Sequence, residues 1–278
     1  MNIFFFSFPY IKVDVIDCSK VEQVEGFTSW ENEALEVQKV IGEFDAIFSS
    51  EESYSPIFKK LYPFAAHEVV DAERIVVPIS GTAVRNMNTM QAYEFLPRTY
   101  QEFANRSVLI VGTESCGKST LTKKLAKYFN TSYTNEYGRD ICEEYGTGQP
   151  DISLYNTIVH GQKMAEREAS MTANKVYFCD TEAIVTEYYA ALYENSPLGV
   201  ARAVAFEEEY DLIIYLEPTN RWVDDGYRKD GEDEVRRKND EFLKSGFEFY
   251  KKDIHILSGT YYENYSNAIK LVRKMMEQ

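Results

Sequence analysis

The chain has 278 residues, which corresponds to one large domain or two modest ones. Its 44% hydrophobic and 27% charged residues are ordinary for a globular protein and exclude the disordered and fibrous classes. No run approaches the roughly 20 continuous apolar residues of a membrane helix, so a membrane protein is not expected. The formal net charge of −15 argues against a broad nucleic-acid-binding face, although backbone amides and a few cations can still hold a small polyanion.

The first hundred residues are predicted to contain alternating strands and helices. Apolar runs at 13–17 and 44–48 are typical of strands. Residues 29–41 between them show helical spacing of apolar side chains, with Ser29 as the expected N-cap. A third apolar run, at 75–79, leads into a Ser-Gly-Thr turn.

Neither the N-terminal residues nor the cysteines indicate export. Residues 1–10 are apolar but lack the Lys/Arg-bearing start and the small-residue cleavage site of a signal peptide. The four cysteines form no CxxC pair, and a chain of this length does not need disulfides. These features favour a reducing, cytoplasmic setting.

A denser pattern follows a connector at about 86–106. Apolar runs predict strands, and amphipathic runs between them predict helices. Because the two alternate, the expected fold class is α/β, with a parallel sheet flanked by helices. The predicted strands are 107–111, 176–179, 211–216 and 253–257, and the predicted helices are 119–129, 154–172 and 264–276.

A phosphate-binding motif lies between the first of these strands and the first helix. The run GTESCGKS at 112–119 matches GxxxxGK[ST] in full. Its backbone amides and the following helix N-terminus favour a bound phosphate, Lys118 supplies a cation, and the Ser119 hydroxyl is a Mg²⁺ ligand. The flanking elements argue against a chance glycine-rich turn. The predicted nucleotide-binding residues are Gly112, Glu114, Ser115, Cys116, Gly117, Lys118, Ser119 and Thr120.

Cys116 within this loop lies where backbone amides and a helix N-terminus could lower the pKa of its thiol. We expect it to act as a spacer rather than as a nucleophile.

Asp180 ends an apolar strand about sixty residues after the loop. A carboxylate in this place is typical of the residue that anchors the metal and its water shell in phosphotransferases. A solvated aspartate at the end of a buried strand is the alternative, and the preceding loop favours the metal. Ser119 and Asp180 are therefore the predicted metal residues.

The run NEYGRD at 135–140 follows a polar segment, 131–134, that is the expected second strand. At this position Glu136 could orient and deprotonate an acceptor hydroxyl, and Arg139 could hold a polar or anionic part of the acceptor. A charged surface turn is an equally good interpretation of the run alone.

Four arginines lie within seventeen residues late in the chain: Arg221, Arg228, Arg236 and Arg237. They fit a lid that closes over the nucleotide and stabilises charge on the migrating phosphoryl group. A solvent-facing helix of alternating charge is the other interpretation.

Taken together, these motifs make the chain from about Arg106 onward resemble the ribosylnicotinamide kinase domain of NadR-type bifunctional proteins. The matching runs are GTESCGKST at 112–120, NEYGRD at 135–140, FCDTE at 178–182 and W-x-x-D-G-x-R at 222–228. The loop alone is generic, whereas the second and fourth runs together are much more specific.

The resemblance implies transfer of phosphate from ATP, with Mg²⁺, to ribosylnicotinamide, giving nicotinamide mononucleotide. It implies a small-molecule nucleoside as the partner, without nucleic acid or membrane, and leaves a homo-oligomer open. The implied catalytic residues are Lys118, Glu136, Asp180 and Arg228, and Arg236 and Arg237 would bind the nucleotide. The implied substrate-binding residues are Glu136, Tyr137, Arg139, Asp140, Trp222 and Asp225, with Tyr137 and Trp222 as candidates to stack on the nicotinamide ring.

The resemblance extends upstream, to the second half of the nicotinamide-nucleotide adenylyltransferase domain of the same family. The runs at 48–52 and 79–85 match, and the second would assign Ser80, Thr82 and Arg85 to ATP phosphates. The GxFxPxHxGH loop of that domain is missing, because His67, His160 and His255 form no HxGH pair. We therefore expect residues 1–100 to be a truncated nucleotidyltransferase-like (partial Rossmann-like) segment without adenylyl transfer, followed by the kinase domain at 101–278.

Two further functions stay open on the sequence alone. A P-loop kinase for another nucleoside or nucleotide shares every feature except the family-specific lid. A non-catalytic module that senses NAD or ATP would bind without turnover, and the complete set of Lys118, Ser119 and Asp180 argues against it. A working bifunctional enzyme is disfavoured by the missing HxGH pair.

Overall fold

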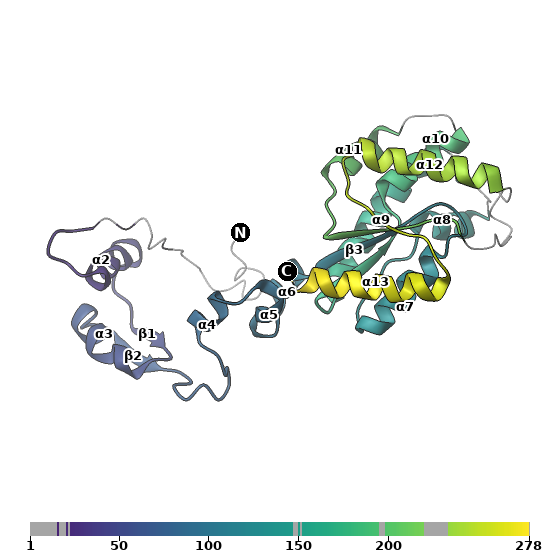
Figure 1. The fold of residues 1–278 in the computed structure, drawn as a ribbon. Coiled ribbons are helices and arrows are strands. Elements are labelled where there is room, and N and C mark those ends of the chain that lie inside the picture. The colour runs from purple at the N-terminus through teal and green to yellow at the C-terminus, as the bar shows by residue number, and fades with distance from the viewer. Residues whose placement is uncertain are drawn as a thin grey trace. The chain divides into compact units, whose positions relative to one another are not determined.

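The computed structural model describes residues 23–146, 152–194, 198–219 and 233–277, together with 16, 21 and 150. The chain divides into two compact units, Met1–Thr99 and Tyr100–Gln278 (Figure 1). The strand predicted at 13–17 lies outside the described residues apart from Ile16, and residues 1–10 lie outside them as well.

The first unit is built around a pair of parallel strands, β1 and β2, in which Ala46 pairs with Ala66. Its small core joins Ala34 to Phe58 and Tyr62, with several aromatic rings packed around them. The elements are α2 (Ser29–Ile41), β1 (Ala46–Ser49), the 3₁₀ helix η2 (Glu52–Tyr54), α3 (Ser55–Leu61), β2 (Ala66–Val69), α4 (Gly81–Arg85), α5 (Thr89–Ala92) and the 3₁₀ helix η3 (Tyr93–Phe95).

One prediction for this unit needs correction. The N-cap of α2 is Thr28 and not Ser29: the Thr28 hydroxyl accepts from the Glu31 amide, and the Glu31 carboxylate accepts from the Thr28 amide. The apolar run at 75–79 forms no strand. Its first three side chains are exposed, because their backbone amides donate to the Asp71 carboxylate and hold the run in a loop. The second strand is instead β2, which carries His67.

The second unit contains a four-stranded parallel sheet in the order β4-β3-β5-β6. This confirms the predicted α/β class with a parallel sheet flanked by helices. The strands are β3 (Arg106–Val111), β4 (Val176–Asp180), β5 (Leu212–Leu216) and β6 (His255–Leu257). The helices are α6 (Arg98–Ala104, which crosses the boundary between the units), α7 (Lys118–Phe129), α8 (Tyr137–Tyr145), α9 (Ile152–Thr172), α10 (Ala183–Glu194), α11 (Gly199–Glu207), α12 (Asp233–Phe249) and α13 (Tyr261–Met276).

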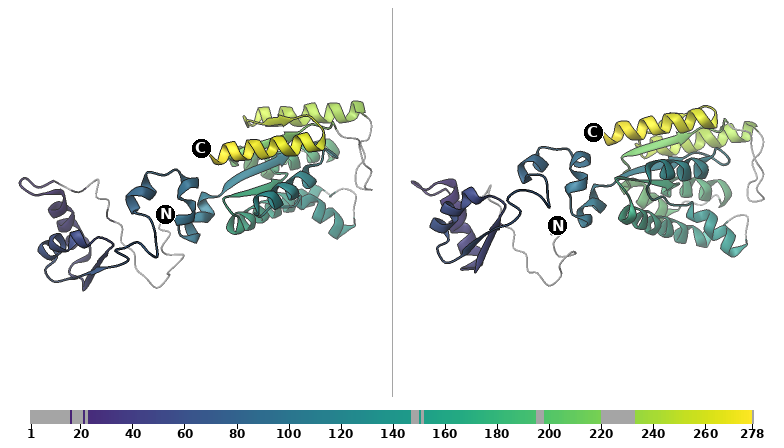
Figure 2. Two further views of the ribbon diagram at one scale, coloured as in Figure 1. Left: turned by 60° about the horizontal axis from the view of Figure 1, so that its bottom comes forward. Right: turned by 90° about the horizontal axis from the view of Figure 1, so that it is seen from below.

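Helices cover both faces of this sheet, as the views in Figure 2 show. Side chains of β3 alternate between the faces, as expected for a strand buried on both sides. Val108 and Ile110 belong to a core cluster with side chains of α7 and α13, whereas Leu109 and Val111 pack with side chains of α10 and α12. The central strand is thus fixed from both faces.

The second strand predicted at 131–134 is reduced to an isolated parallel bridge between Tyr133 and Phe178. Only two backbone hydrogen bonds join the segment to β4, Thr134 N to Phe178 O and Phe178 N to Ser132 O. The Ser132 hydroxyl instead donates to Ala169 O on α9. Threonine hydroxyls bond β4 on either side of this bridge: Thr131 Oγ1 donates to Val176 O, and Thr134 Oγ1 accepts from the Asp180 amide.

Among the described residues, no helix combines the length and the apolar character needed to cross a membrane.

We predict that Gly112→Ala destabilises the protein by about 2–4 kcal/mol, because a side chain at this position has no room. A Cβ atom there would lie 2.3 Å from Leu216 O at the end of β5, and the backbone φ of 145° also disfavours a side chain. Urea-induced unfolding measures the effect. Gly199→Ala, at the start of α11 where a Cβ meets nothing within 4 Å, is the matched control and should change stability by no more than about 0.5 kcal/mol. Equal stability of the two variants would contradict the prediction.

Candidate functional site

The loop between β3 and α7 has the geometry of an anion-binding turn. It leaves β3 at Gly112 and enters α7 at Gly117, which has a φ of 93° and leaves no side chain to cap the helix. The N-terminal end of α7 is therefore open, and its dipole and amides favour a negatively charged ligand.

Lys118, the first residue of α7, is a buried cation with 6% of its surface exposed. Its Nζ donates to Thr113 O in the same loop at 2.9 Å. Burial lowers the pKa of this ammonium group, but the acidic groups of Cys116, Glu136 and Asp180 raise it, and the net change is upward. Lys118 is therefore charged at neutral pH.

Asp180, at the end of β4, is a buried carboxylate with 1% of its surface exposed. Burial, followed by the charge of Glu136, raises its pKa to about 6, against the opposing effects of Lys118 and of a hydrogen bond from Ser119. Its Oδ1 has no hydrogen-bond partner. The orphaned carboxylate oxygen and the neighbouring serine hydroxyl together are suitable ligands for a hard cation.

The prediction of a lowered thiol pKa for Cys116 is wrong. Its side chain is buried, and Sγ donates to Thr113 O at 3.0 Å. Burial raises the pKa of the thiol, and this effect exceeds the influence of Lys118 and the loop amides. The residue fills space beneath the loop, as a spacer would.

A cavity of about 310 Å³ opens beside the loop, within the size range of small-molecule sites. Its wall is formed by the loop and the start of α8 together with α9 and α10. The loop and the start of α8 contribute Glu114, Ser115, Gly117, Lys118, Ser119, Thr120, Glu136, Gly138 and Arg139. The contribution of α9 and α10 includes Tyr155, Ile158, Gln162, Val185, Thr186, Tyr189 and Tyr193.

The structure thus brings most of the predicted loop residues together with Glu136 and Arg139. Glu136 is the N-cap residue of α8, and Arg139 Nη2 lies 3.7 Å from Glu136 Oε2. Gly112, Cys116 and Asp180 do not line the cavity.

Other predicted residues lie elsewhere. The Tyr137 ring packs on α9 so closely that a Cβ at Gly161 would lie 2.1 Å from it, and Asp140 is exposed. On α12, Arg236 is buried and Arg237 forms an exposed ion pair with Glu241. None of these four predicted residues lines the cavity. Arg221, Trp222, Asp225 and Arg228 lie outside the described residues.

Gln162 on α9 is a site residue that the sequence analysis missed. Its side chain is 4% exposed, and its amide forms hydrogen bonds to Tyr137 N, Thr134 Oγ1, Asp180 O and Thr181 O. The available signal was its spacing: Gln162 lies on the face of α9 that also buries Tyr155, Val159 and Ala169. A polar side chain on such a face needs hydrogen-bond partners.

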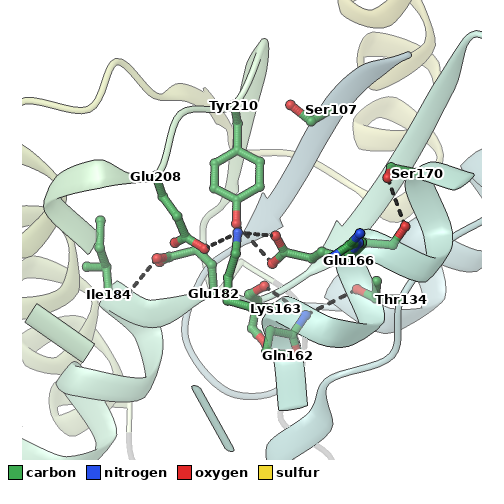
Figure 3. A network of polar contacts seen from close by, with 12 residues as sticks. Ser107, Thr134, Gln162, Lys163, Glu166, Ser170, Glu182, Ile184, Glu208 and Tyr210 are labelled. Atoms are coloured by element: carbon green, nitrogen blue, oxygen red, sulfur yellow. Dashed lines mark hydrogen bonds and ion pairs between the residues drawn. The ribbon is translucent and has the colours of Figure 1, made fainter. Parts of the chain in front are cut away.

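A second buried polar cluster lies next to this site and ties α9, α10 and the end of α11 together (Figure 3). Lys163 Nζ lies 2.6 Å from both Glu166 Oε2 and Glu208 Oε1, and the Tyr210 hydroxyl donates to Glu166 Oε1. The Glu182 carboxylate accepts from the Ile184 and Val185 amides and so caps α10. Burial raises the pKa of Glu166 to about 7 and also raises that of Glu182. This cluster fixes the turn that follows Asp180.

Comparison with known proteins gives consistent relatives for this chain. The family model described as "AAA domain" matches residues 107–264. The "Trifunctional NAD biosynthesis/regulator protein NadR" of Escherichia coli (strain K12) is 33% identical over 241 aligned residues, which cover 84% of this chain and 57% of that protein. The chain therefore spans a little over half the length of this relative.

Two solved structures share the architecture. One, described as a NadR protein in complex with NR, has 26% identity and a TM-score of 0.68, and the match covers 91% of this chain and 76% of that one. The other, described as a NadR protein in complex with NAD and AMP-PNP, has 22% identity and a TM-score of 0.71, with 99% and 81% covered. The similarity to this second structure shows that the two chains share a fold.

We predict that Asp180→Asn stabilises the protein at pH 8 and has little effect at pH 4. The folded-state pKa is raised to about 6, so wild-type stability falls as the pH rises from about 4 through about 6 and the buried carboxyl ionises. The amide lacks this charge, and the gain in unfolding free energy should reach up to about 3 kcal/mol above pH 7.

Urea-induced unfolding at a series of pH values measures this difference. Asp253→Asn, at an exposed aspartate, is the control and should show no growing gain with pH. A gain for Asp180→Asn that stays constant or shrinks between pH 4 and pH 8 would contradict the assignment of a buried, destabilising charge.

Proposed function

We propose that the chain, which belongs to the family described as "AAA domain" over residues 107–264, is an ATP-dependent kinase. In the proposed reaction it converts ribosylnicotinamide to nicotinamide mononucleotide. The NadR relative, whose name places it in NAD biosynthesis, supports this substrate class. The observation that carries the proposal is the cavity itself, which both the loop cation Lys118 and the carboxylate Glu136 line.

The donor nucleotide is assigned to the loop and the open end of α7. The loop amides would hold the β- and γ-phosphates, and Lys118 would neutralise charge that develops on the transferred group. Lys118 is suited to this role because it stays charged although it is buried.

A Mg²⁺ ion fits beside the loop. Ser119 Oγ and the orphaned Asp180 Oδ1 would hold it. Within the described parts of the chain, no group of three or more His, Cys, Asp and Glu side chains is arranged to hold a metal. When bound, the ion would neutralise negative charge on the phosphate groups.

The acceptor hydroxyl is assigned to Glu136. Its carboxylate lines the cavity at the start of α8 and could accept the proton as the 5′-oxygen attacks the γ-phosphorus and ADP leaves. Arg139, one turn along the same helix, would hold a polar part of the acceptor. Positioning and charge neutralisation carry most of the catalysis in such transfers, so a strong base is not required.

The flat base of the acceptor suits the aromatic side chains of the cavity wall. Tyr189 and Tyr193, four residues apart on α10, line the cavity with parallel rings whose centroids lie 5.9 Å apart. We assign base contact to this pair in place of Tyr137, whose ring packs on α9. Trp222, Asp225 and Arg228, with Arg236 and Arg237, stay predictions from the family resemblance.

We further propose that residues 1–100 form a nucleotidyltransferase-like segment without adenylyl transfer, and that residues 101–278 form the kinase. The parallel β1–β2 pair and the division of the chain near residue 99 support this organisation. Within the segment, the Ser80 hydroxyl caps α4 by accepting from the Ala83 amide. Arg85 donates to Thr82 Oγ1.

The proposed function predicts that the purified chain forms nicotinamide mononucleotide from ribosylnicotinamide and Mg·ATP, and that Lys118→Ala lowers this rate at least about a hundredfold. Chromatography of the products measures the rate, and a panel of other nucleosides tests the specificity. Lys127→Ala, on the exposed face of the same helix, is the control and should retain full activity. If another nucleoside gives product and ribosylnicotinamide gives none, the proposed substrate is wrong. If the chain binds ATP or the nucleoside but forms no product, it is a sensor and not a kinase.

For the acceptor side, Glu136→Gln is expected to lower kcat at least about tenfold while the KM for ATP changes by less than about twofold. The amide keeps the size of the side chain but cannot take a proton. Steady-state kinetics with each substrate varied gives both constants, with Glu143→Gln on the exposed side of α8 as the control. An unchanged kcat would leave positioning alone as the contribution of Glu136.

A further inference from the structure

The two carboxylates of the site stand on separate elements that need a common anchor. Glu136 is the N-cap residue of α8 but its own side chain does not cap the helix, and Asp180 ends β4. The segment before Glu136 joins β4 through the short bridge at Tyr133 and through two threonine hydroxyls, at Thr131 and Thr134. The relative position of the two carboxylates therefore depends on side-chain contacts in addition to the backbone bonds of the sheet.

Gln162 contacts both elements with opposite ends of one amide group. On one side, Oε1 accepts from the Tyr137 amide at 3.0 Å, directly after Glu136. On the other side, Nε2 donates to Asp180 O at 3.3 Å and Thr181 O at 3.3 Å. One buried side chain thus connects the backbone at both carboxylates.

The backbone after Asp180 is strained and needs this support. Thr181 has a φ of 67°, in the left-handed region that a β-branched residue rarely adopts. Such a residue costs about 1–3 kcal/mol and persists only where its surroundings impose it. The bond from Gln162 to Thr181 O is one restraint, and the bond from Thr181 N to Ile110 O is another.

A third partner of Gln162 closes the network. Nε2 also donates to Thr134 Oγ1 at 3.2 Å, and that oxygen accepts from the Asp180 amide at 3.2 Å. The amide of glutamine is needed here because it offers an acceptor toward α8 and donors toward the two carbonyls. A methionine of similar length would supply neither.

We propose that Gln162 is a positioning residue that fixes the positions of Glu136 and Asp180 relative to each other. This role rests on the proposed kinase function. Gln162 acts on the reaction through the backbone to which the two carboxylates belong.

The test compares Gln162→Met with Val272→Ala in kinase assays and in urea-induced unfolding. Val272 is fully buried on α13 in the core cluster on one face of the sheet and does not line the cavity, so its truncation destabilises the protein without touching the site. For Gln162→Met we expect kcat to fall at least tenfold and the Mg²⁺ concentration for half-maximal rate to rise several-fold, with the KM for ATP within about twofold. For Val272→Ala we expect lower stability with kcat and the Mg²⁺ requirement unchanged.

A Gln162→Met variant that loses stability like Val272→Ala but keeps the wild-type kcat and Mg²⁺ requirement would overturn the proposal and leave only a packing role. A fall in kcat with an equal fall in the control would overturn it too, since general loosening would then explain both. A wild-type chain without turnover would overturn the proposed function itself, and the positioning role with it. These results are distinguishable because the wild-type assay is run beside both variants.

Discussion

The parallel register of β3 with its neighbours is the constraint on which the site depends. It places Ile110 beside Asp180 of β4 and Val111 beside Tyr215 of β5, so the loop that leaves β3 starts between the ends of two other strands. Because parallel strands end at the same edge, ligand sites of such sheets lie there. Gly112 is required for the same reason, since Leu216 O occupies the space of a side chain.

Much of the second unit could be predicted because its signals are local. The apolar runs of β3 and β5 are continuous, as expected for strands buried on both faces, and the loop motif has a fixed spacing. The strand expected at 131–134 could not be excluded from the sequence, because only the folded chain shows that threonine hydroxyls at 131 and 134 bond the β4 backbone on either side of the bridge. β2, with its alternating pattern, was missed beside the stronger apolar run at 75–79.

The role of Gln162 lay beyond local patterns altogether. Its partners extend from Thr134 to Thr181, and only the folded chain brings them to one amide group. The Tyr137 ring illustrates the opposite error. Its position next to Glu136 suggested a place in the cavity, but successive residues of a helix point in different directions, and the ring packs against Gly161. A sequence motif predicts which segment of the chain reaches a site. It does not predict the direction in which each side chain of that segment points.

Burial distinguishes the two carboxylates, Glu136 and Asp180, both of which the family resemblance implies as catalytic residues. Asp180 is buried and does not line the cavity, it is hydrogen-bonded to Ser119 and has an orphaned oxygen, and burial makes its charge costly unless a cation compensates it. Glu136 lines the cavity at a helix start, where an acceptor can reach it. The first environment favours a metal ligand and the second a group that meets the substrate. These environments support the proposed roles of Glu136 at the acceptor hydroxyl and of Asp180 at the metal, and the charge of Lys118, which interacts with both carboxylates, limits the repulsion that they would otherwise create.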